Sequence, residues 1–178
     1  MEAIGSVFVA LPLPPEIKLA LMARIEVLDI PGKLVPPENL HLTVRFLGSV
    51  DQVTYERFLA SLSEAEMPKS FTIRLGAFGG FPKPIKATVV WVGIEDGLAG
   101  LGAINEITES AAQSAGLAAE ERRFRPHLTM ARVRPQRDIS HLLQEEIGFG
   151  WEASEIAVYQ SYPGGGGVRY EVLEWFSL

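Results

Sequence analysis

The sequence contains no cysteine and no long apolar run, and histidine is scarce. The absence of cysteine among 178 residues excludes disulfides, thiolate zinc sites and cysteine nucleophiles. No stretch of 18 consecutive apolar residues is present, so we expect no membrane-spanning helix. The apolar stretch GSVFVALPLPPE follows Glu2 rather than a basic region, which favours a buried strand over a signal peptide. We therefore expect a cytoplasmic protein with no membrane partner.

Basic residues are also in deficit. The chain has 16 Lys and Arg against 22 Asp and Glu, for a net charge of −6. This balance argues against a protein that coats nucleic acid non-specifically, although a local basic cleft remains compatible with it. The 47% hydrophobic content is ordinary for a globular protein. At this length we expect one domain spanning residues 1–178, with a sizeable core.

Two of the three histidines stand in the same short phrase. Residues 38–48 read ENLHLTVRFLG, and residues 124–133 read FRPHLTMARV, so His-Leu-Thr occurs at His41 and again at His127. A single His-x-Thr in a strand is usually structural. A duplicated phrase at matching stations of a repeated topology favours a functional role.

The elements predicted from hydrophobic periodicity repeat around these phrases. Helices are expected to begin at Pro15 and after N-capping Asp51, Asp96 and Asp138, the last of these being a short helix through 142–147. Strands are expected at 4–11, 40–47, 70–78, 87–94, 126–133, 153–160 and 168–176. Residues 12–95 and 96–178 thus each give a helix, a His-Thr strand, a helix and two strands. This order predicts a duplicated unit with pseudo-two-fold symmetry.

The two phrases can form one phosphate site. Side chains alternate along a strand, so His41 and Thr43 share one face, as do His127 and Thr129. A pseudo-two-fold axis would bring both pairs to one cleft, where two hydroxyls can hold a tetrahedral phosphate. One imidazole can accept a proton while the other donates one, because the ordinary histidine pKa lies near neutrality. Two histidines are too few for catalytic zinc and no acidic cluster accompanies them, so we expect no metal.

The sequence resembles the 2H phosphoesterase superfamily and, within it, the RNA 2′,3′-cyclic phosphodiesterases, historically called 2′-5′ RNA ligases. The resemblance rests on VFVALPLPPE, VPPENLHLTVRFLG, VVWVGI, ERRFRPHLTMARV and VYQSYPGGGGVRYEVLEWF, and runs nearly end to end. It implies an α+β fold of two pseudo-symmetric lobes, each an antiparallel sheet with helices on its outer face, and an active cleft between them. It also implies opening of cyclic phosphates at RNA 3′ ends to 2′-phosphates, without cofactor or metal. By the same resemblance, His41 is the proton donor, His127 is the proton acceptor, and Thr43 and Thr129 hold the phosphate.

Further contacts are weaker predictions. Arg45 is in phase with His41 and can face the cleft, whereas Arg132 would do so only if a bulge re-aims it. Five arginines surround the second phrase and form either a phosphate track or a solvated rim: Arg122, Arg123, Arg125, Arg134 and Arg137. The remaining candidate substrate contacts are Arg125, Phe124, Ser161 and Tyr162, the last two in a loop, SYPGGGG, that we interpret as a flexible strand connection.

Two other functions stay open. The chain could act on a small cyclic nucleotide or a nucleotide-sugar cyclic phosphate, or it could be a non-catalytic module that binds RNA ends. For the RNA reading, tRNA halves are candidate substrates, reversal to 2′-5′ ligation is left open, and we expect a monomer.

Overall fold

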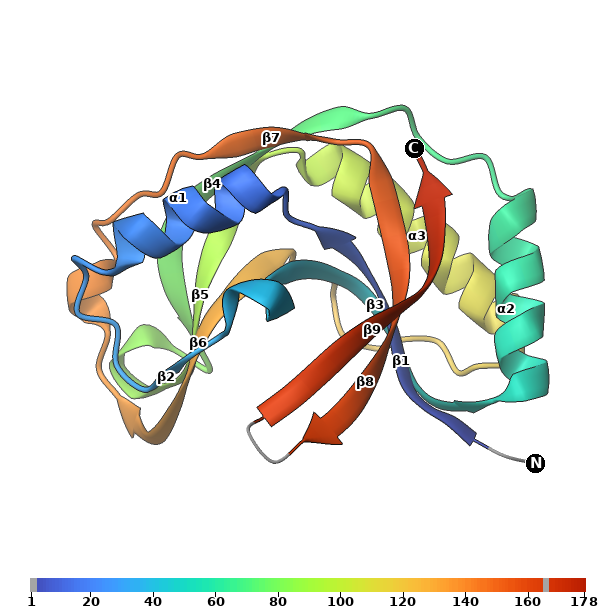
Figure 1. The fold of residues 1–178 in the computed structure, drawn as a ribbon, viewed down its shortest axis with the longest axis horizontal. Helices are drawn as coiled ribbons and strands as arrows, with labels where there is room; N and C mark the ends of the chain where they lie inside the picture. The colour runs from blue at the N-terminus through green and yellow to red at the C-terminus, as the bar shows by residue number, and fades with distance from the viewer. Residues whose placement is uncertain (1–2, 165–166) are drawn as a thin grey trace.

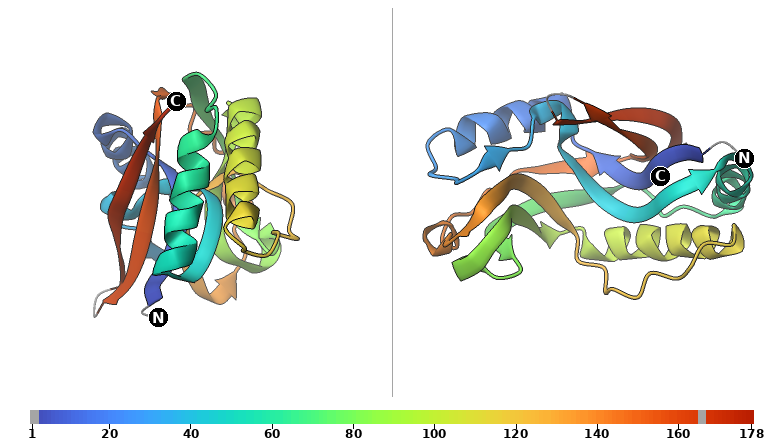
Figure 2. Two further views of the ribbon diagram at one scale, coloured as in Figure 1. Left: turned by 90° about the vertical axis from the view of Figure 1, so that its right-hand side faces the viewer. Right: turned by 90° about the horizontal axis from the view of Figure 1, so that it is seen from below.

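The structure is a computed structural model that describes residues 3–164 and 167–178. One strongly curled antiparallel sheet runs through the molecule, in the order β7-β4-β5-β6-β3-β1-β8-β9, with the short β2 paired to β6 (Figures 1 and 2). The strands are β1 Ala3–Pro12, β2 Lys33–Leu34, β3 His41–Asp51, β4 Phe71–Phe81, β5 Ala87–Asp96, β6 His127–Arg137, β7 Gly150–Ala153, β8 Glu155–Gly164 and β9 Gly167–Ser177.

Within the described residues, three α-helices cover the sheet. They are α1 Pro15–Ile25, α2 Gln52–Glu64 and α3 Leu98–Ser114. Figure 1 shows α2 and α3 beside each other at one end of the molecule and α1 at the other. An ion pair of 2.6 Å between Arg24 and Glu145 ties α1 to the segment before β7. Buried side chains of α3, including Leu101 and Ile104, join the same hydrophobic core as those of the strands.

The sheet divides into two lobes of four strands. We call β3, β1, β8 and β9 the β3 lobe, and β6, β5, β4 and β7 the β6 lobe. The lobes join where β3 pairs with β6. Each lobe takes strands from both halves of the sequence, because β4 pairs with β5 and β7 while β8 pairs with β1. The α+β fold with two antiparallel lobes is therefore confirmed. The division into repeat halves at 12–95 and 96–178 stays a prediction.

Several expected boundaries agree with the structure. Pro15 is the first residue of α1, and the Asp51 carboxylate caps α2 by accepting a 2.8 Å hydrogen bond from the Thr54 amide. Helix α3 ends two residues before Gly116, whose φ of +94° lies in the left-handed region that glycine favours.

Two expectations are wrong in detail, and one strand was not predicted. The N-cap of α3 is Gly97 rather than Asp96, whose carboxylate instead accepts from the Gly97 amide. The segment after Asp138 forms only a single 3₁₀ turn, Ser140–Leu142, because the Asp138 carboxylate binds the nearby Ser140 rather than starting a longer helix. The four-residue strand β7 gave too short a pattern to be detected.

Candidate active site

The two His-Leu-Thr phrases lie on neighbouring strands that meet at their central residues. Leu42 of β3 pairs with Leu128 of β6 in antiparallel register, and both side chains are buried. Side chains on adjacent residues of a strand point to opposite faces. The histidines and threonines of both phrases therefore share the face opposite this leucine pair, and all four are half-buried. The fold places the four predicted catalytic residues on one surface at the junction of the lobes.

Both imidazoles are oriented in the same way. The Nδ1 of His41 lies 2.7 Å from the carbonyl oxygen of Asn39, and the Nδ1 of His127 lies 2.6 Å from that of Arg125. A carbonyl oxygen can only accept, so each Nδ1 carries the hydrogen. In each ring this leaves Nε2 as the atom available to exchange a proton with a substrate. Sequence reasoning missed these carbonyls, because the partner is a main-chain atom of an ordinary residue.

The surroundings of the two rings differ. His41 packs against Phe8 and Tyr170, with ring centroids 4.9 and 5.1 Å away. Burial lowers the pKa of His41 to about 4; the hydrogen bond to Asn39 opposes this shift, and the charges of Lys18 and His127 add to it. His41 is therefore neutral near pH 7 when no anion is bound.

His127 has a smaller aromatic neighbourhood. Phe81 meets its ring edge-on with centroids 5.0 Å apart, and Trp91 lies 6.1 Å away at a tilt. Phe81 is the last residue of β4, and Trp91 pairs with Thr129 across β5 and β6. Neither was among the predicted site residues, since an apolar residue in a strand carries no sign in the sequence of which cleft it borders.

Both phrases are followed by the same break in register. On β3, Ala10 pairs with Thr43 while Val9 pairs with Arg45, and on β6, Trp91 pairs with Thr129 while Val90 pairs with Ala131. One residue is extra in each case, which is how a β-bulge works. The burial patterns agree. Counting the histidine as the first residue, the fourth and fifth residues of both strands are buried and the sixth is exposed.

The bulges decide which residue rejoins the catalytic face. On β6 it is Arg132, which is exposed; the bulge is present, but Arg132 does not line the cavity described below, and its contact with substrate stays a prediction. On β3 it is Phe46, with 53% of its surface exposed, and its ring lies 5.5 Å from that of Phe8. Simple alternation assigned this role to Arg45, and that orientation is wrong because the bulge turns Arg45 inward, where it is only 8% exposed.

Arg45 is committed to other partners. Its Nε lies 2.5 Å from Glu109 of α3, its Nη2 donates to the Ala118 carbonyl at 2.9 Å, and its Nη1 binds the Phe46 carbonyl. One turn earlier on α3, Asn105 donates to the Val44 carbonyl at 3.0 Å. The two helix residues thus hold the bulge from the side. Arg45 lines the cavity described next, but its Nε, Nη1 and Nη2 are all bound within the protein, so its role is to support the site.

A cavity of about 560 Å³ opens beside Thr43 and His127. Its strand wall includes Phe46 and Phe81, and its far wall is the loop before β6, with Arg122, Arg123, Phe124 and Arg125. Phe124 is half-buried against the core, while Arg125 is exposed. The structure thus brings the predicted residues Arg125 and Phe124 into one cavity with Thr43 and His127. Arg134 and Arg137 lie on β6 and do not line this cavity.

The other two predicted contacts lie on the β3 lobe. Ser161 and Tyr162 are half-buried residues of β8, and Tyr162 lies under the guanidinium of Arg169, 5.4 Å from its ring centroid. Neither lines the cavity, so their contact with substrate stays a prediction. The prediction of a flexible loop at 161–167 is wrong for residues 161–164 and 167, because they belong to the paired strands β8 and β9. Residues 165–166 of that prediction lie outside the described residues.

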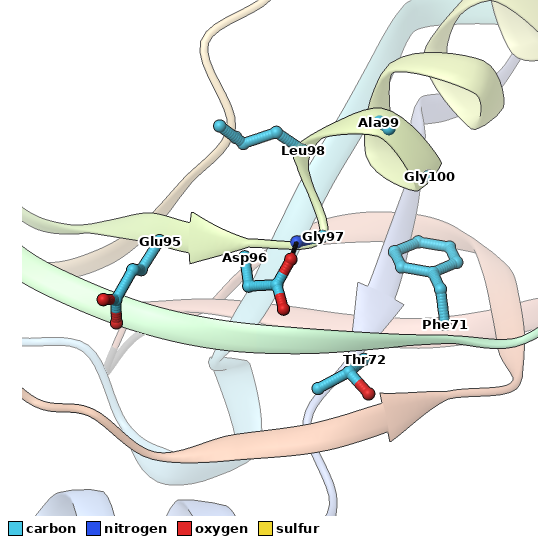
Figure 3. A pocket seen from close by; sticks show the side chains of 8 residues that line it. All are labelled: Phe71, Thr72, Glu95, Asp96, Gly97, Leu98, Ala99 and Gly100. Atoms are coloured by element: carbon cyan, nitrogen blue, oxygen red, sulfur yellow. Dashed lines mark hydrogen bonds between the residues drawn. The ribbon is translucent and has the colours of Figure 1, made fainter.

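A second cavity, of about 350 Å³, lies at the start of α3 (Figure 3). Its wall carries the carboxylates of Glu95 and Asp96, and Asp96 already occupies the Gly97 amide at 2.8 Å. These charges disfavour an anion despite the helix N-terminus. None of the residues around this cavity belongs to the two phrases.

Neither metal ligands nor membrane spans stand out in the described part of the chain. Residues 3–164 and 167–178 contain no group of three or more His, Cys, Asp or Glu side chains placed to hold a metal ion. Among the same residues, no helix has the length and apolar character needed to cross a bilayer.

Comparisons with known proteins agree with this geometry. A family model described as LigT-like phosphoesterase matches residues 11–91. The RNA 2′,3′-cyclic phosphodiesterase of Methanocaldococcus jannaschii is 32% identical over 176 residues, covering 94% of this chain and 98% of the relative. That of Escherichia coli is 30% identical, covering 96% and 95%. The structure of E. coli LigT in apo form matches with a TM-score of 0.85 and 27% identity, over 100% of this chain and 99% of that one. The complex of E. coli LigT with 3′-AMP matches with a TM-score of 0.82.

Proposed function

The chain belongs to the family of LigT-like RNA 2′,3′-cyclic phosphodiesterases, and we propose that it opens 2′,3′-cyclic phosphates at RNA 3′ ends to leave 2′-phosphates. One observation carries the proposal. The two His-Leu-Thr strands pair at Leu42 and Leu128, which puts two imidazoles and two hydroxyls on one face, each imidazole with Nδ1 tied to a carbonyl.

The chemistry needs one proton accepted and one donated. Nε2 of His127 takes a proton from a water molecule as its oxygen attacks phosphorus. The bond from phosphorus to the 3′ oxygen breaks, and Nε2 of His41 delivers a proton to that oxygen. Each transfer contributes typically ~10²–10⁴-fold. The assignment of donor and acceptor follows the family resemblance, because the two hydrogen-bond patterns are alike.

The neighbouring groups have supporting roles. The hydroxyls of Thr43 and Thr129 donate to the non-bridging oxygens, and Arg132 supplies positive charge from the same face. Because the pKa of His41 is low in the unbound protein, its ring must become charged before it can donate a proton from Nε2. A bound phosphodiester anion favours the charged imidazole and raises that pKa, so the substrate itself prepares the donor.

The cellular setting follows as part of the proposal. We expect a cytoplasmic monomer acting on RNA ends such as those of tRNA halves. If a 5′-hydroxyl of another RNA replaces water, the same proton transfers form a 2′-5′ bond.

The test uses a short RNA ending in a 2′,3′-cyclic phosphate, incubated in EDTA with wild type, His41→Ala and His127→Ala. Chromatography then identifies the position of the phosphate in the product. We expect a 2′-phosphate from wild type and a loss of ~10²–10⁴-fold for each variant. Turnover that persists in both variants would refute the mechanism.

A small cyclic phosphate is the second candidate substrate, and the net charge of −6 favours it. A non-catalytic module that binds RNA ends would show binding of the cyclic-ended RNA and no turnover of it by wild type.

A further inference from the structure

The cavity beside His127 combines two surfaces that single-stranded RNA requires. One is aromatic: Phe46, Phe81 and Phe124 border it. The other is basic: Arg122, Arg123 and Arg125 come from the loop before β6. Bases stack on aromatic side chains, while the backbone follows positive charge. The volume of about 560 Å³ falls within the range of cavities that hold a small organic ligand.

The positive charge of the cavity is not uniform. Arg45 is paired with Glu109 at 2.5 Å, and Arg122 is paired with Glu120, whose carboxylate it meets at 3.0 Å. Hydrogen bonds from Arg122 lower the pKa of Glu120 to about 2, so that carboxylate stays charged and compensates Arg122. Among the described residues, Arg123 and Arg125 have no acidic partner. The unbalanced charge of this wall is therefore carried by these two side chains.

The basic wall is held in place from inside the protein. Glu109 accepts from the Glu120 amide at 3.1 Å as well as from Arg45, and Arg45 also binds the Ala118 carbonyl. The loop is thus fixed at 118 and 120 to α3 and to the bulge of β3. The carbonyl of Arg125 then orients His127. The same short loop therefore carries two arginines and positions a catalytic ring.

We propose that this cavity is a subsite for the RNA nucleotides leading up to the cyclic phosphate, with bases on the phenylalanines and an internucleotide phosphate between Arg123 and Arg125. The inference rests on the proposed function and sharpens its substrate class. A cyclic mononucleotide has no internucleotide phosphate to offer. The enzyme should therefore prefer a cyclic-ended oligonucleotide to the corresponding cyclic mononucleotide.

The test compares kcat/KM for 2′,3′-cyclic AMP with kcat/KM for a trinucleotide ending in the same cyclic adenosine. The variant is Arg123→Ala/Arg125→Ala, and the matched control is Arg134→Ala/Arg137→Ala, which removes the same charge from β6 outside the cavity. We expect kcat/KM of wild type to be at least about tenfold higher for the trinucleotide than for 2′,3′-cyclic AMP. In Arg123→Ala/Arg125→Ala this ratio should fall by about tenfold, which corresponds to the loss of one charge-assisted contact. The control should keep the preference within about twofold.

Two further readouts separate this subsite from general electrostatics. Phe46→Ala should lower the trinucleotide preference by about fivefold or more, which corresponds to the loss of one base stack. For the trinucleotide, the dependence of log(kcat/KM) on log[salt] should become shallower by about 0.7 for each phosphate that Arg123→Ala/Arg125→Ala leaves without a cationic partner.

Equal kcat/KM for both substrates in wild type, or equal loss in variant and control, would overturn the subsite. A parallel binding measurement with the trinucleotide bearing a terminal 2′-phosphate does not depend on turnover. If wild type fails to hydrolyse either substrate but binds this RNA, and Arg123→Ala/Arg125→Ala weakens binding more than the control, the proposed function fails and the subsite stands. If both double variants bind it as wild type does, the subsite fails.

Discussion

Strands β3 and β6 share the same backbone features but carry different side chains at equivalent positions. Each begins with His-Leu-Thr, ties Nδ1 of its histidine to the carbonyl two residues earlier and bulges at the same place. At the inward position of the bulge β3 has Arg45 and β6 has Ala131, and at the outward position β3 has Phe46 and β6 has Arg132. The symmetry of the site therefore lies in its main chain. The asymmetry that chemistry requires comes from side chains that differ at equivalent positions.

The inward position should respond most strongly in stability. Replacing Arg45 by Met leaves the half-buried Glu109 carboxylate without its ion-pair partner and the Ala118 carbonyl without its donor. Breaking a buried pair on one side costs about 3 kcal/mol in the free energy of unfolding, measured by urea titration. Arg132→Met, at the exposed outward position of β6, should stay within about 0.5 kcal/mol of wild type. Similar losses in both variants would contradict the different roles assigned to these arginines.

The outward position should respond in catalysis. In the proposed mechanism Arg132 makes a charge-assisted contact to the reacting phosphate, and Arg132→Ala would remove this contact, worth about 1.5–3 kcal/mol. We expect kcat/KM for a cyclic-ended RNA to fall by about 10–100-fold while the folded structure is retained. Restoring charge with Arg132→Lys should recover part of the loss. A variant with wild-type kcat/KM would remove Arg132 from the site.

The low pKa of His41 should be visible in the pH profiles of the reaction. The profile of kcat/KM reports the free enzyme, in which burial lowers the pKa of His41 to about 4, whereas kcat reports the complex, in which the bound anion raises it. If His41 is the donor, the limb that falls with rising pH should lie at a higher pH in kcat than in kcat/KM. Coincident limbs would contradict the idea that substrate charges this ring.

The low pKa of His41 should also appear as a pH dependence of stability. Its pKa is about 4 in the folded protein and near 6.5 when unfolded, so between these values the unfolded chain binds more protons. The free energy of unfolding should therefore fall as the pH is lowered from 6.5 towards 4. In His41→Gln this part of the slope should vanish, and in His141→Gln, a substitution of an exposed histidine, it should remain. Parallel curves of unfolding free energy against pH for wild type and His41→Gln would refute the contribution of His41 to this pH dependence.

Sequence reasoning succeeded where the signal is periodic or repeated. His41, Thr43, His127 and Thr129 share a face because alternation within each phrase is strict up to the bulge. It failed at Arg45, since a bulge adds one residue without changing local composition. It also missed Phe46 and Phe81, because an apolar residue next to a catalytic face looks like a core residue until the neighbouring strands are placed.

By itself, the sequence determined the chemistry of the site: two imidazoles and two hydroxyls at repeated stations, and the alternation that turns them away from the core. Tertiary structure alone decided the rest. Pairing of Leu42 with Leu128 brought the repeats together. The bulges turned Phe46 and Arg132, rather than Arg45 and Ala131, to the face that carries the histidines. Packing of His41 against aromatic rings buried it and lowered its pKa. These outcomes depend on register and on distant contacts, which come from the packing of strands far apart in the chain.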